Sequence, residues 1–332
     1  MPSATPRARQ NAMHLPVLVE EAMEWLAVRP EGVYLDATVG AGGHAKAILE
    51  RLTTGRLIAI DKDPMAVEIA RENLKAHAER LTLLEQDFSE LPWLLGRLAL
   101  KGVDGILADL GLSQMQIDTP QRGFSFQAEG PLDMRMNPNQ RLTAAEIVNR
   151  YGERELANLI YQYGEERRSQ RIARAIVRAR PIQNTRKLAE LIAACLGGRR
   201  EASRPAYRRK REGSGAAART IKPLIHPATR TFQALRIAVN QELDRLTQFL
   251  IQVPDCLLPG GRIVVISFHS LEDRPVKQQF RRWQQEGTMR TLTRHVVRPS
   301  LEEVRRNRRA RSARLRAAER LPVPGGSSSQ SQ

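Results

Sequence analysis

Glycines and acids that could bind a nucleotide lie close together near the start of this sequence. Asp36 ends a short apolar run, Gly40, Gly42 and Gly43 follow it, and a second apolar run ends at Asp61. Glycine lets the backbone approach a ligand closely, because it has no Cβ. An acid about twenty residues after such a loop can accept hydrogen bonds from two ribose hydroxyls. The spacing therefore predicts a nucleotide-binding βαβ unit.

Two ligands fit this loop. Gly40, Gly42 and Ala45 satisfy the dinucleotide fingerprint, which would suit an NAD-linked oxidoreductase. Asp36 favours S-adenosylmethionine instead, because a carboxylate beside the loop repels a pyrophosphate but helps to hold a sulfonium and an α-ammonium. We therefore expect a methyl donor here. His44 either contacts this ligand or simply begins the next helix, and the spacing alone does not decide.

Another acid and an aromatic residue follow later strands. Asp109 ends the fourth apolar run, and ligands gather at the carboxyl ends of parallel strands. We expect Asp109 to touch both cofactor and substrate; the alternative is a helix-capping aspartate. Phe88, which follows the third run, either stacks on the adenine or packs in the core.

The polar cluster from Ser267 to Asp273 follows the fifth apolar run. Its residues are too close together for separate roles in a Ser-His-Asp triad, and no nucleophile-elbow pattern is present. His226, His269 and Asp273 show no repeated metal-ligand spacing, so we predict no metal. We expect His269 to help position the substrate.

The composition points to a polyanionic partner. The chain has 332 residues and a formal net charge of +17, which favours nucleic acid. The arginines at 167–180, 199–211 and 305–316 fit a phosphate-contacting surface, with a solvated helix face as the alternative. With only Cys195 and Cys256, no disulfide framework can form, which indicates a cytoplasmic location. No apolar run approaches the roughly 20 residues of a membrane span.

Apolar runs that alternate with helical patterns predict an α/β fold with a doubly wound, parallel sheet. Candidate strands lie at 33–37, 57–61, 81–85, 105–110, 262–268, 290–297 and 312–318. The helices between the first four lie at 44–52, 64–80 and 91–101.

The alternation stops after the fourth strand. No strand pattern appears from 114 to 195, where helices begin near Thr143, Glu153, Glu165 and Thr185. A single long helix at 227–250 leads back to the sheet. We therefore predict a sheet domain at 13–112 and 220–320, and an inserted, mainly helical substrate-recognition domain at 113–219. Within the insertion, 197–219 is expected to form a basic mobile loop. Disordered tails are expected at 1–12 and 321–332.

Several long blocks of this chain are distinctive. They include Tyr34-Leu-Asp-Ala-Thr-Val-Gly-Ala-Gly-Gly-His44, Asp104-Gly-Ile-Leu-Ala-Asp-Leu-Gly-Leu-Ser113, Pro131-Leu-Asp-Met-Arg-Met136, His226-Pro-Ala-Thr-Arg-Thr-Phe232 and Ile266-Ser-Phe-His-Ser-Leu-Glu-Asp-Arg274. Blocks of this kind run in order from about His14 to Arg320. In them the chain resembles the bacterial cytosine-N4 methyltransferases of small-subunit ribosomal RNA, the RsmH (MraW) family.

The resemblance implies a class I S-adenosylmethionine-dependent methyltransferase with a seven-stranded, Rossmann-like sheet. It implies a cytidine in the decoding region of 16S rRNA as substrate, within the small ribosomal subunit, and a homodimer as one possible assembly. The alternative to an enzyme is a non-catalytic RNA-binding assembly factor. The cofactor-binding positions that it implies are Gly42, Gly43, His44, Asp61, Phe88, Asp109 and Gln116. Where the family has Ser-Ser-Pro-Gln, this chain reads Ser113-Gln-Met-Gln116, which alters the surroundings of Gln116.

For such a reaction we expect Asp109 to be the catalytic residue. Cytosine N4 is a poor nucleophile, so it must be held in line with the methyl group and must donate a hydrogen bond. Asp109 and the backbone carbonyls of 109–112 are the candidate acceptors. The base must also leave any stack and meet an aromatic face. Phe124, Phe126 and Phe268 are candidates for that face, and a core role is the alternative for each.

Overall fold

The computed structural model describes residues 16–197 and 226–322, and these form two compact units. The sheet unit comprises the described residues up to 111 and from 246 onward. The helical unit comprises the described residues from 112 to 245. This second boundary differs from the expected one at 219/220. The expected tail at 1–12, nearly all of the expected loop at 197–219, and the tail from 323 onward lie outside the described residues.

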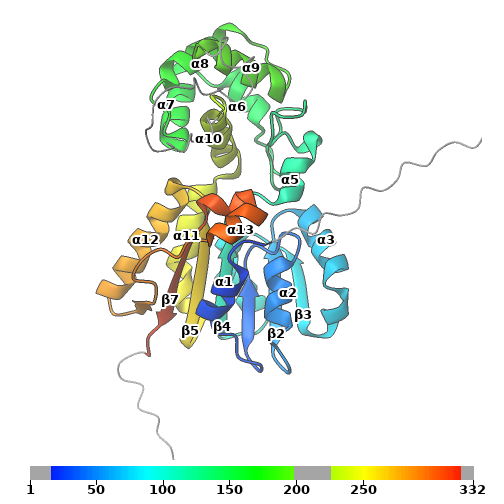
Figure 1. The fold of residues 1–332 in the computed structure, drawn as a ribbon, viewed down its shortest axis with the longest axis vertical. Helices are drawn as coiled ribbons and strands as arrows, with labels where there is room; N and C mark the ends of the chain where they lie inside the picture. The colour runs from blue at the N-terminus through cyan, green and yellow to red at the C-terminus, as the bar shows by residue number, and fades with distance from the viewer. Residues whose placement is uncertain (1–15, 198–225, 323–332) are drawn as a thin grey trace, which may run out of the picture. The chain divides into compact units, whose positions relative to one another are not determined.

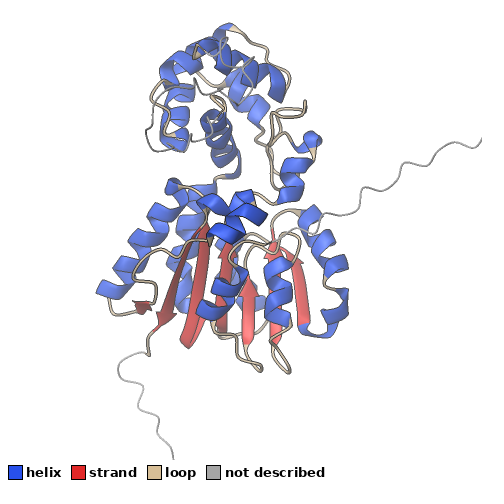
Figure 2. Cartoon of the chain, in the orientation of Figure 1, coloured by secondary structure: helices blue, strands red, loops and turns tan. Residues whose placement is uncertain are grey.

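A mixed sheet of seven strands forms the centre of the sheet unit (Figure 2). The strands are β1 (Val33–Asp36), β2 (Arg56–Asp61), β3 (Leu81–Glu85), β4 (Val103–Asp109), β5 (Leu257–Ser267), β6 (Met289–Thr291) and β7 (Arg314–Arg320). Their order is β3-β2-β1-β4-β5-β7-β6, and β7 alone runs antiparallel to its neighbours. The prediction of a mostly parallel, seven-stranded α/β fold is confirmed.

Helices cover both faces of this sheet. They are α1 (Val19–Leu26), α2 (Gly43–Leu49), α3 (Pro64–Asn73), α4 (Leu91–Arg97), α11 (Glu242–Cys256), α12 (Ser270–Gln285) and α13 (Leu301–Arg306). Apolar side chains of α1, α2 and α3 share one buried cluster with the sheet, and those of α4, α11 and α12 share the other. Figure 1 shows α1, α2 and α3 together on one side. The central strands β1, β2, β4 and β5 are thereby largely buried, and acids lie at the carboxyl ends of β1, β2 and β4.

Several element boundaries differ from the sequence-based prediction. The helix expected at 64–80 ends at Asn73, because Leu74 leaves the helical region, and a 3₁₀ segment at Lys75–Arg80 follows. The strand expected at 290–297 spans only Met289–Thr291. β5 spans Leu257–Ser267 and so begins five residues before the strand expected at 262–268. The long helix expected at 227–250 is two helices, because Gln241 has a left-handed backbone with φ of 50°.

The helical unit contains α5 (Gln114–Asp118), α6 (Ala144–Arg150), α7 (Glu153–Gly164), α8 (Ser169–Arg178), α9 (Thr185–Cys195) and α10 (Thr229–Asn240). Its core includes Ile160 of α7, Ile172 of α8 and Leu235 of α10. Gly164 ends α7 against α10, where a Cβ would lie 2.7 Å from the carbonyl oxygen of Arg230. None of the helices in the described part of the chain is long and apolar enough to cross a membrane.

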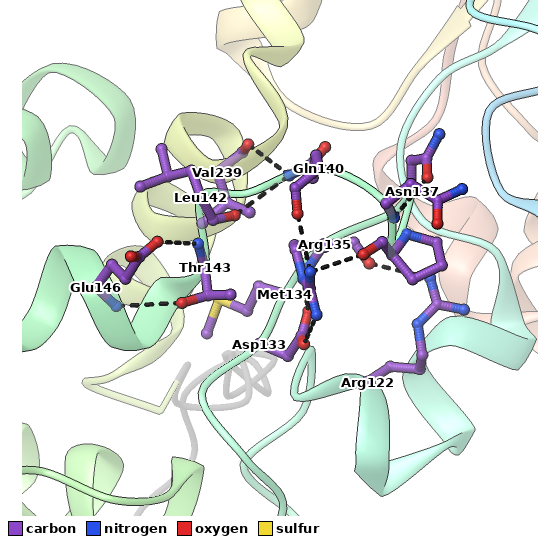
Figure 3. Close-up of polar contacts among 12 residues, drawn as sticks. Arg122, Asp133, Met134, Arg135, Asn137, Gln140, Leu142, Thr143, Glu146 and Val239 are labelled. Atoms are coloured by element: carbon purple, nitrogen blue, oxygen red, sulfur yellow. Dashed lines mark hydrogen bonds and ion pairs between the residues drawn. The ribbon is translucent and has the colours of Figure 1, made fainter.

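A polar network organises the irregular segment before α6 (Figure 3). Asp133 accepts bidentate hydrogen bonds from Arg135, at 2.9 and 2.7 Å. The Arg135 guanidinium also donates to the Gln140 carbonyl at 2.8 Å, and Arg122 donates to the Arg135 carbonyl at 3.0 Å. Burial works to raise the pKa of Asp133, but the hydrogen bonds and charge of Arg135, with the charge of Arg122, leave it below its usual value. The helical unit therefore supplies the counter-charge for this acid itself.

Candidate active site at the carboxyl ends of β1, β2 and β4

The glycine loop joins β1 to α2 and is fastened to the end of β2. Gly40 and Gly42 have φ of 51° and 90°, values that glycine adopts without strain. The Gly40 amide donates to Asp61 Oδ2 at 3.0 Å, so the two sequence signals of the βαβ unit are in direct contact. A Cβ on Gly43 would lie 2.8 Å from the ring of Pro16, which shows how closely the segment before α1 covers this loop.

Two carboxyl groups flank the loop at the ends of β1 and β2, with Asp36 buried and Asp61 partly exposed. Asp61 accepts a second hydrogen bond from the Asp63 amide at 3.0 Å, and burial raises its pKa to about 6. Asp36 is 1% exposed. Its Oδ1 accepts from the Thr38 amide at 3.1 Å, whereas its Oδ2 is buried without a partner among the described residues. Burial, helped by the Asp61 charge, raises the pKa of Asp36 to about 7.

The third acid, Asp109, ends β4 as the sequence predicted. Its amide donates to Thr38 Oγ1 at 2.7 Å, which links β4 to the glycine loop. Asp109 Oδ1 is buried and has no hydrogen-bond partner in the described part of the chain. Burial raises the pKa of Asp109 well above its usual value, the charges of Asp36 and Glu272 raise it further, and Arg309 opposes them.

These three acids make the carboxyl ends of β1, β2 and β4 a site for a cation. A buried carboxylate without a counter-charge is unfavourable, so a nearby positive charge is needed to favour the ionised form. A ligand that carries positive charge would stabilise the ionised acids and would be stabilised by them. The negative charge at these strand ends would repel a pyrophosphate.

His44 occupies the first turn of α2, where its side chain is buried. Nε2 lies 2.9 Å from the Val17 carbonyl oxygen, and Nδ1 lies 3.6 Å from Asp109 Oδ2. The ring therefore connects the segment before α1 to the end of β4. The sequence left open whether His44 meets a ligand or begins the helix; in the structure it does begin α2, and it faces Asp109.

Phe88 begins a 3₁₀ turn at Phe88–Glu90, directly after β3. Its ring packs edge-on against Phe249 of α11, with centroids 5.1 Å apart. The ring is partly buried and contacts the core cluster on that face of the sheet. This contact fixes the ring at the edge of the core, and a stacking role toward an adenine remains a prediction.

His269 has a structural role that sequence reasoning missed. Its Nδ1 accepts the Glu272 amide at 3.3 Å as the N-cap of α12, and its Nε2 lies 3.0 Å from Glu272 Oε1. Glu272 in turn accepts the Phe268 amide at 2.9 Å. The Asp273 carboxylate pairs with Arg316 of β7 at 2.7 Å. Arg316 was expected on the phosphate-contacting surface, but it is instead committed to this ion pair.

Several residues that orient or charge the site come from different segments of the chain. Thr38 orients Asp109, Val17 orients His44, and Glu272 and Arg309 set the charge around Asp109. A His-x-x-Glu spacing at the start of a helix is a capping-box pattern and could have identified the His269–Glu272 pair. The Val17 and Arg309 contacts depend on the fold and carry no local signal.

Gln116 belongs to the helical unit, within α5. It forms a capping box with Ser113, whose amide donates to Gln116 Oε1 at 3.1 Å. The side chain is buried. The structure therefore gives Gln116 a local role at the start of α5, and its expected contact with the cofactor stays a prediction. Phe124 and Phe126 also lie in the helical unit, where Phe126 packs on His226 and Phe232.

The helical unit also contains a pocket of about 440 Å³. Tyr151 and Tyr163 line it together with the acids Glu155 and Asp244 and with apolar residues such as Leu159. The neighbouring acids raise the pKa of both tyrosines, after burial, which is the larger cause. An acidic lining of this kind repels phosphate, so this pocket is a poor place for an RNA backbone.

Comparison with known proteins accounts for nearly the whole chain. Residues 11–321 match the model of the MraW methylase family. The chain belongs to this family. It is 50% identical over 322 residues to the "Ribosomal RNA small subunit methyltransferase H" of Koribacter versatilis, which covers 95% of this chain and 96% of the relative. The protein of the same name from Acidobacterium capsulatum is 50% identical over 319 residues, covering 94% and 99%.

Solved structures give a weaker likeness. An rRNA methylase from Streptococcus thermophilus aligns over 92% of this chain and 96% of its own, with 9% identity and a TM-score of 0.41. As a member of the MraW methylase family, the chain is a methyltransferase, and its prediction as an enzyme is confirmed.

Proposed function

We propose that this methylase transfers a methyl group from S-adenosylmethionine to the N4 amino group of a cytidine in the decoding region of 16S rRNA. The observation that carries the proposal is a pair of buried carboxyl oxygens, one each from Asp36 and Asp109, that have no hydrogen-bond partner among residues 16–197 and 226–322. The names of the relatives support small-subunit ribosomal RNA as the substrate.

The acids and the glycine loop fit this methyl donor. S-adenosylmethionine supplies an electrophilic methyl group on a sulfonium and carries an α-ammonium. Asp36 and Asp109 offer these cations the negative charge that they lack. Asp61, at the end of β2, offers its carboxylate to the ribose hydroxyls. The backbone of Gly42 and Gly43 lies beside His44 in the same loop, and Phe88 completes the proposed set within the sheet unit. A contact between the cofactor and Gln116 of the helical unit stays a prediction from the resemblance.

Asp109 is the catalytic residue of the proposal. Cytosine N4 must approach the methyl carbon in line, at about 3 Å, with its lone pair free of the ring. A hydrogen bond from N4 to Asp109 Oδ1 would hold the amino group in that orientation. The same oxygen would then receive the proton that N4 loses after its new bond to carbon has formed.

The alternatives fit less well. An NAD-linked oxidoreductase would place a pyrophosphate beside the buried Asp36, whose ionised carboxylate would repel it. A non-catalytic assembly factor would have no need for a buried acid with an open oxygen at the end of β4. Neither alternative is supported by the methylase relatives.

The exposed arginines of α8 are the proposed contacts to RNA phosphates. Arg171 and Arg178 lie on the outer face of α8, opposite the buried Ile172 and Ile176. Neither guanidinium has a carboxylate partner among the described residues, whereas Arg174 pairs with Glu153 at 3.2 Å. Action in the cytoplasm on the small ribosomal subunit belongs to the same proposal. A homodimer stays a prediction that sedimentation would test.

The proposal is tested by mapping small-subunit rRNA by mass spectrometry in a strain that lacks this protein. We expect the decoding-region cytidine to lose one N4 methyl group, and a plasmid copy of the wild-type chain to restore it. A copy carrying Asp109→Ala should be made in equal amount and should not restore it. Unchanged modification in the deletion strain would overturn the substrate. Calorimetric titration with S-adenosylmethionine and with NAD separates the two cofactors independently of RNA.

A further inference from the structure

The His44 ring is held in one orientation, and that orientation defines its protons. Nε2 lies 2.9 Å from the Val17 carbonyl oxygen, which can only accept a hydrogen bond. Nε2 therefore carries hydrogen. In a neutral ring this leaves Nδ1 as a bare acceptor, and Nδ1 is the nitrogen that faces Asp109 Oδ2 at 3.6 Å.

An acceptor nitrogen that faces a carboxylate is unfavourable unless a proton lies between them. The distance of 3.6 Å exceeds that of a formed hydrogen bond, yet contacts of this kind often tighten only when an active site is loaded. Both residues are also held in place by further hydrogen bonds. The Asp109 backbone is bound to Thr38, and the His44 ring is bound to Val17.

We propose that His44 and Asp109 share one proton, and that His44, as an imidazolium, is the positioning residue that keeps Asp109 ionised and its Oδ1 open toward cytosine N4. This inference rests on the proposed function. It assigns His44 a role through Asp109, in addition to any contact that its loop makes with the methyl donor.

The charges around Asp109 explain why such a partner is needed. Asp36 at the end of β1 and Glu272 at the start of α12 both oppose its ionisation, and burial opposes it more strongly than either. Arg309, in the 3₁₀ segment Arg308–Ser312, is the cation that favours ionisation. A protonated His44 adds a second positive charge on the side of Oδ2. Oδ1 is thereby left as the carboxylate oxygen for the substrate.

The proton balance of the reaction follows from this arrangement. The N4 lone pair forms the new N–C bond, while the electron pair of the breaking S–C bond stays on sulfur. N4 then carries a positive charge and gives one of its protons to Asp109 Oδ1. That proton passes to solvent as the products leave, and the proton shared with His44 stays with the pair. If Asp109 were already protonated, it could not accept the N4 proton.

Two substitutions separate this role from a purely structural one. Glutamine at position 44 can still donate to the Val17 carbonyl but cannot charge, so His44→Gln should keep the fold and lose the partner of Asp109. Asparagine is shorter and can donate toward Asp109, but it does not reach Val17. We expect His44→Gln to lower kcat about 100-fold and His44→Asn about tenfold.

The pH profile provides a second readout. In His44→Gln the acidic limb of the kcat profile should move to higher pH, because Asp109 has lost the positive charge that favoured its ionisation. If His44→Gln behaves like the wild type while His44→Asn is the impaired variant, His44 only anchors the segment before α1. The proposal is then wrong.

A nitrogen-15 spectrum of the histidine rings tests the pair without RNA or methyl donor. At pH 7 both ring nitrogens of His44 should resonate as protonated, with the signal assigned by its absence in His44→Gln. In Asp109→Asn, Nδ1 should move to the unprotonated position while Nε2 stays protonated. An identical spectrum in Asp109→Asn would overturn the shared proton. Because this readout needs no substrate, it stands or falls separately from the proposed function.

Discussion

Two aspartates, one in each unit, show how differently the units treat a buried negative charge. Asp133 in the helical unit accepts two hydrogen bonds from Arg135, and its pKa is lowered. Asp109 in the sheet unit has one open buried oxygen among the described residues and a strongly raised pKa. The first acid stabilises its own fold. The second is unfavourable in the protein alone, which is what a site made for a cationic ligand requires.

The largest effect should come from removing the charge of Asp109. Asp109→Asn keeps the shape of the side chain but cannot accept the N4 proton, so we expect kcat to fall about 10³-fold. The thermal midpoint should stay within a few degrees of the wild type, because burial already disfavours the ionised form of Asp109 in the folded protein. Single-turnover methyl transfer and thermal unfolding, measured on the same preparation, check this. Loss of activity together with a large fall in Tm would show that Asp109 is structural.

The strand-end acids should also give the protein an unusual dependence of stability on pH. Asp36 and Asp61 have folded pKa values of about 7 and about 6, above the ordinary 3.8. Between the ordinary pKa of 3.8 and these raised values, the folded state binds more protons than the unfolded state. Their contribution is therefore fully present below about pH 4 and is lost as pH rises through 7.

Asp36→Asn tests this linkage in a single residue. We expect the fall in unfolding free energy between pH 4 and 8 to shrink by about 2–4 kcal/mol, because one of the titrating groups has gone. Denaturant unfolding at a series of pH values measures it. Glu286→Gln, at an exposed ion pair with Arg282, is the matched control and should leave the slope unchanged. An unchanged slope in Asp36→Asn would show that this acid is ionised in the folded protein.

The contribution of Asp133 to stability should depend on pH in the opposite direction. Asp133 has a lowered pKa, so its stabilising contribution is present above the ordinary value and is lost as pH falls. We expect Asp133→Asn to cost about 1–2 kcal/mol at pH 7, because charge-assisted hydrogen bonds to Arg135 are replaced by weaker ones. Hydrogen exchange in α6 reports the loss locally. Asp118→Asn, at an exposed residue of α5, is the control and should cost much less.

The same contrast explains how much of the molecule could be predicted from its sequence. Asp36, Gly42, Asp61 and Asp109 were predicted because strand ends and glycine turns have local patterns, and the structure brings all four to one edge of the sheet. The protonation of the three acids was beyond prediction, since it depends on burial and, for Asp109, also on Glu272, which lies far along the chain.

The predicted boundary of the helical unit was wrong for a similar reason. Helix-forming residues continue from α10 into α11, so nothing in the local pattern marks the break at Gln241. Phe232 and Leu235 pack in the core of the helical unit, whereas Phe249 packs against the sheet. Their amphipathic spacing is the same in both helices. The unit to which each helix belongs depends on what the helix packs against. α10 packs in the helical unit, and α11 packs chiefly against the sheet.

The smallest expected effect concerns charges that neither unit buries. Arg171 and Arg178 are exposed and lack carboxylate partners in the described part of the helical unit, so each is free to contact a phosphate. We expect the double substitution by glutamine to weaken rRNA binding about tenfold and to lower the slope of log K against log salt by about 2. Arg174→Gln is the matched control, because Arg174 already pairs with Glu153 on the same helix. Equal losses in the control and the double variant would mean that net charge, rather than this face of α8, attracts the RNA.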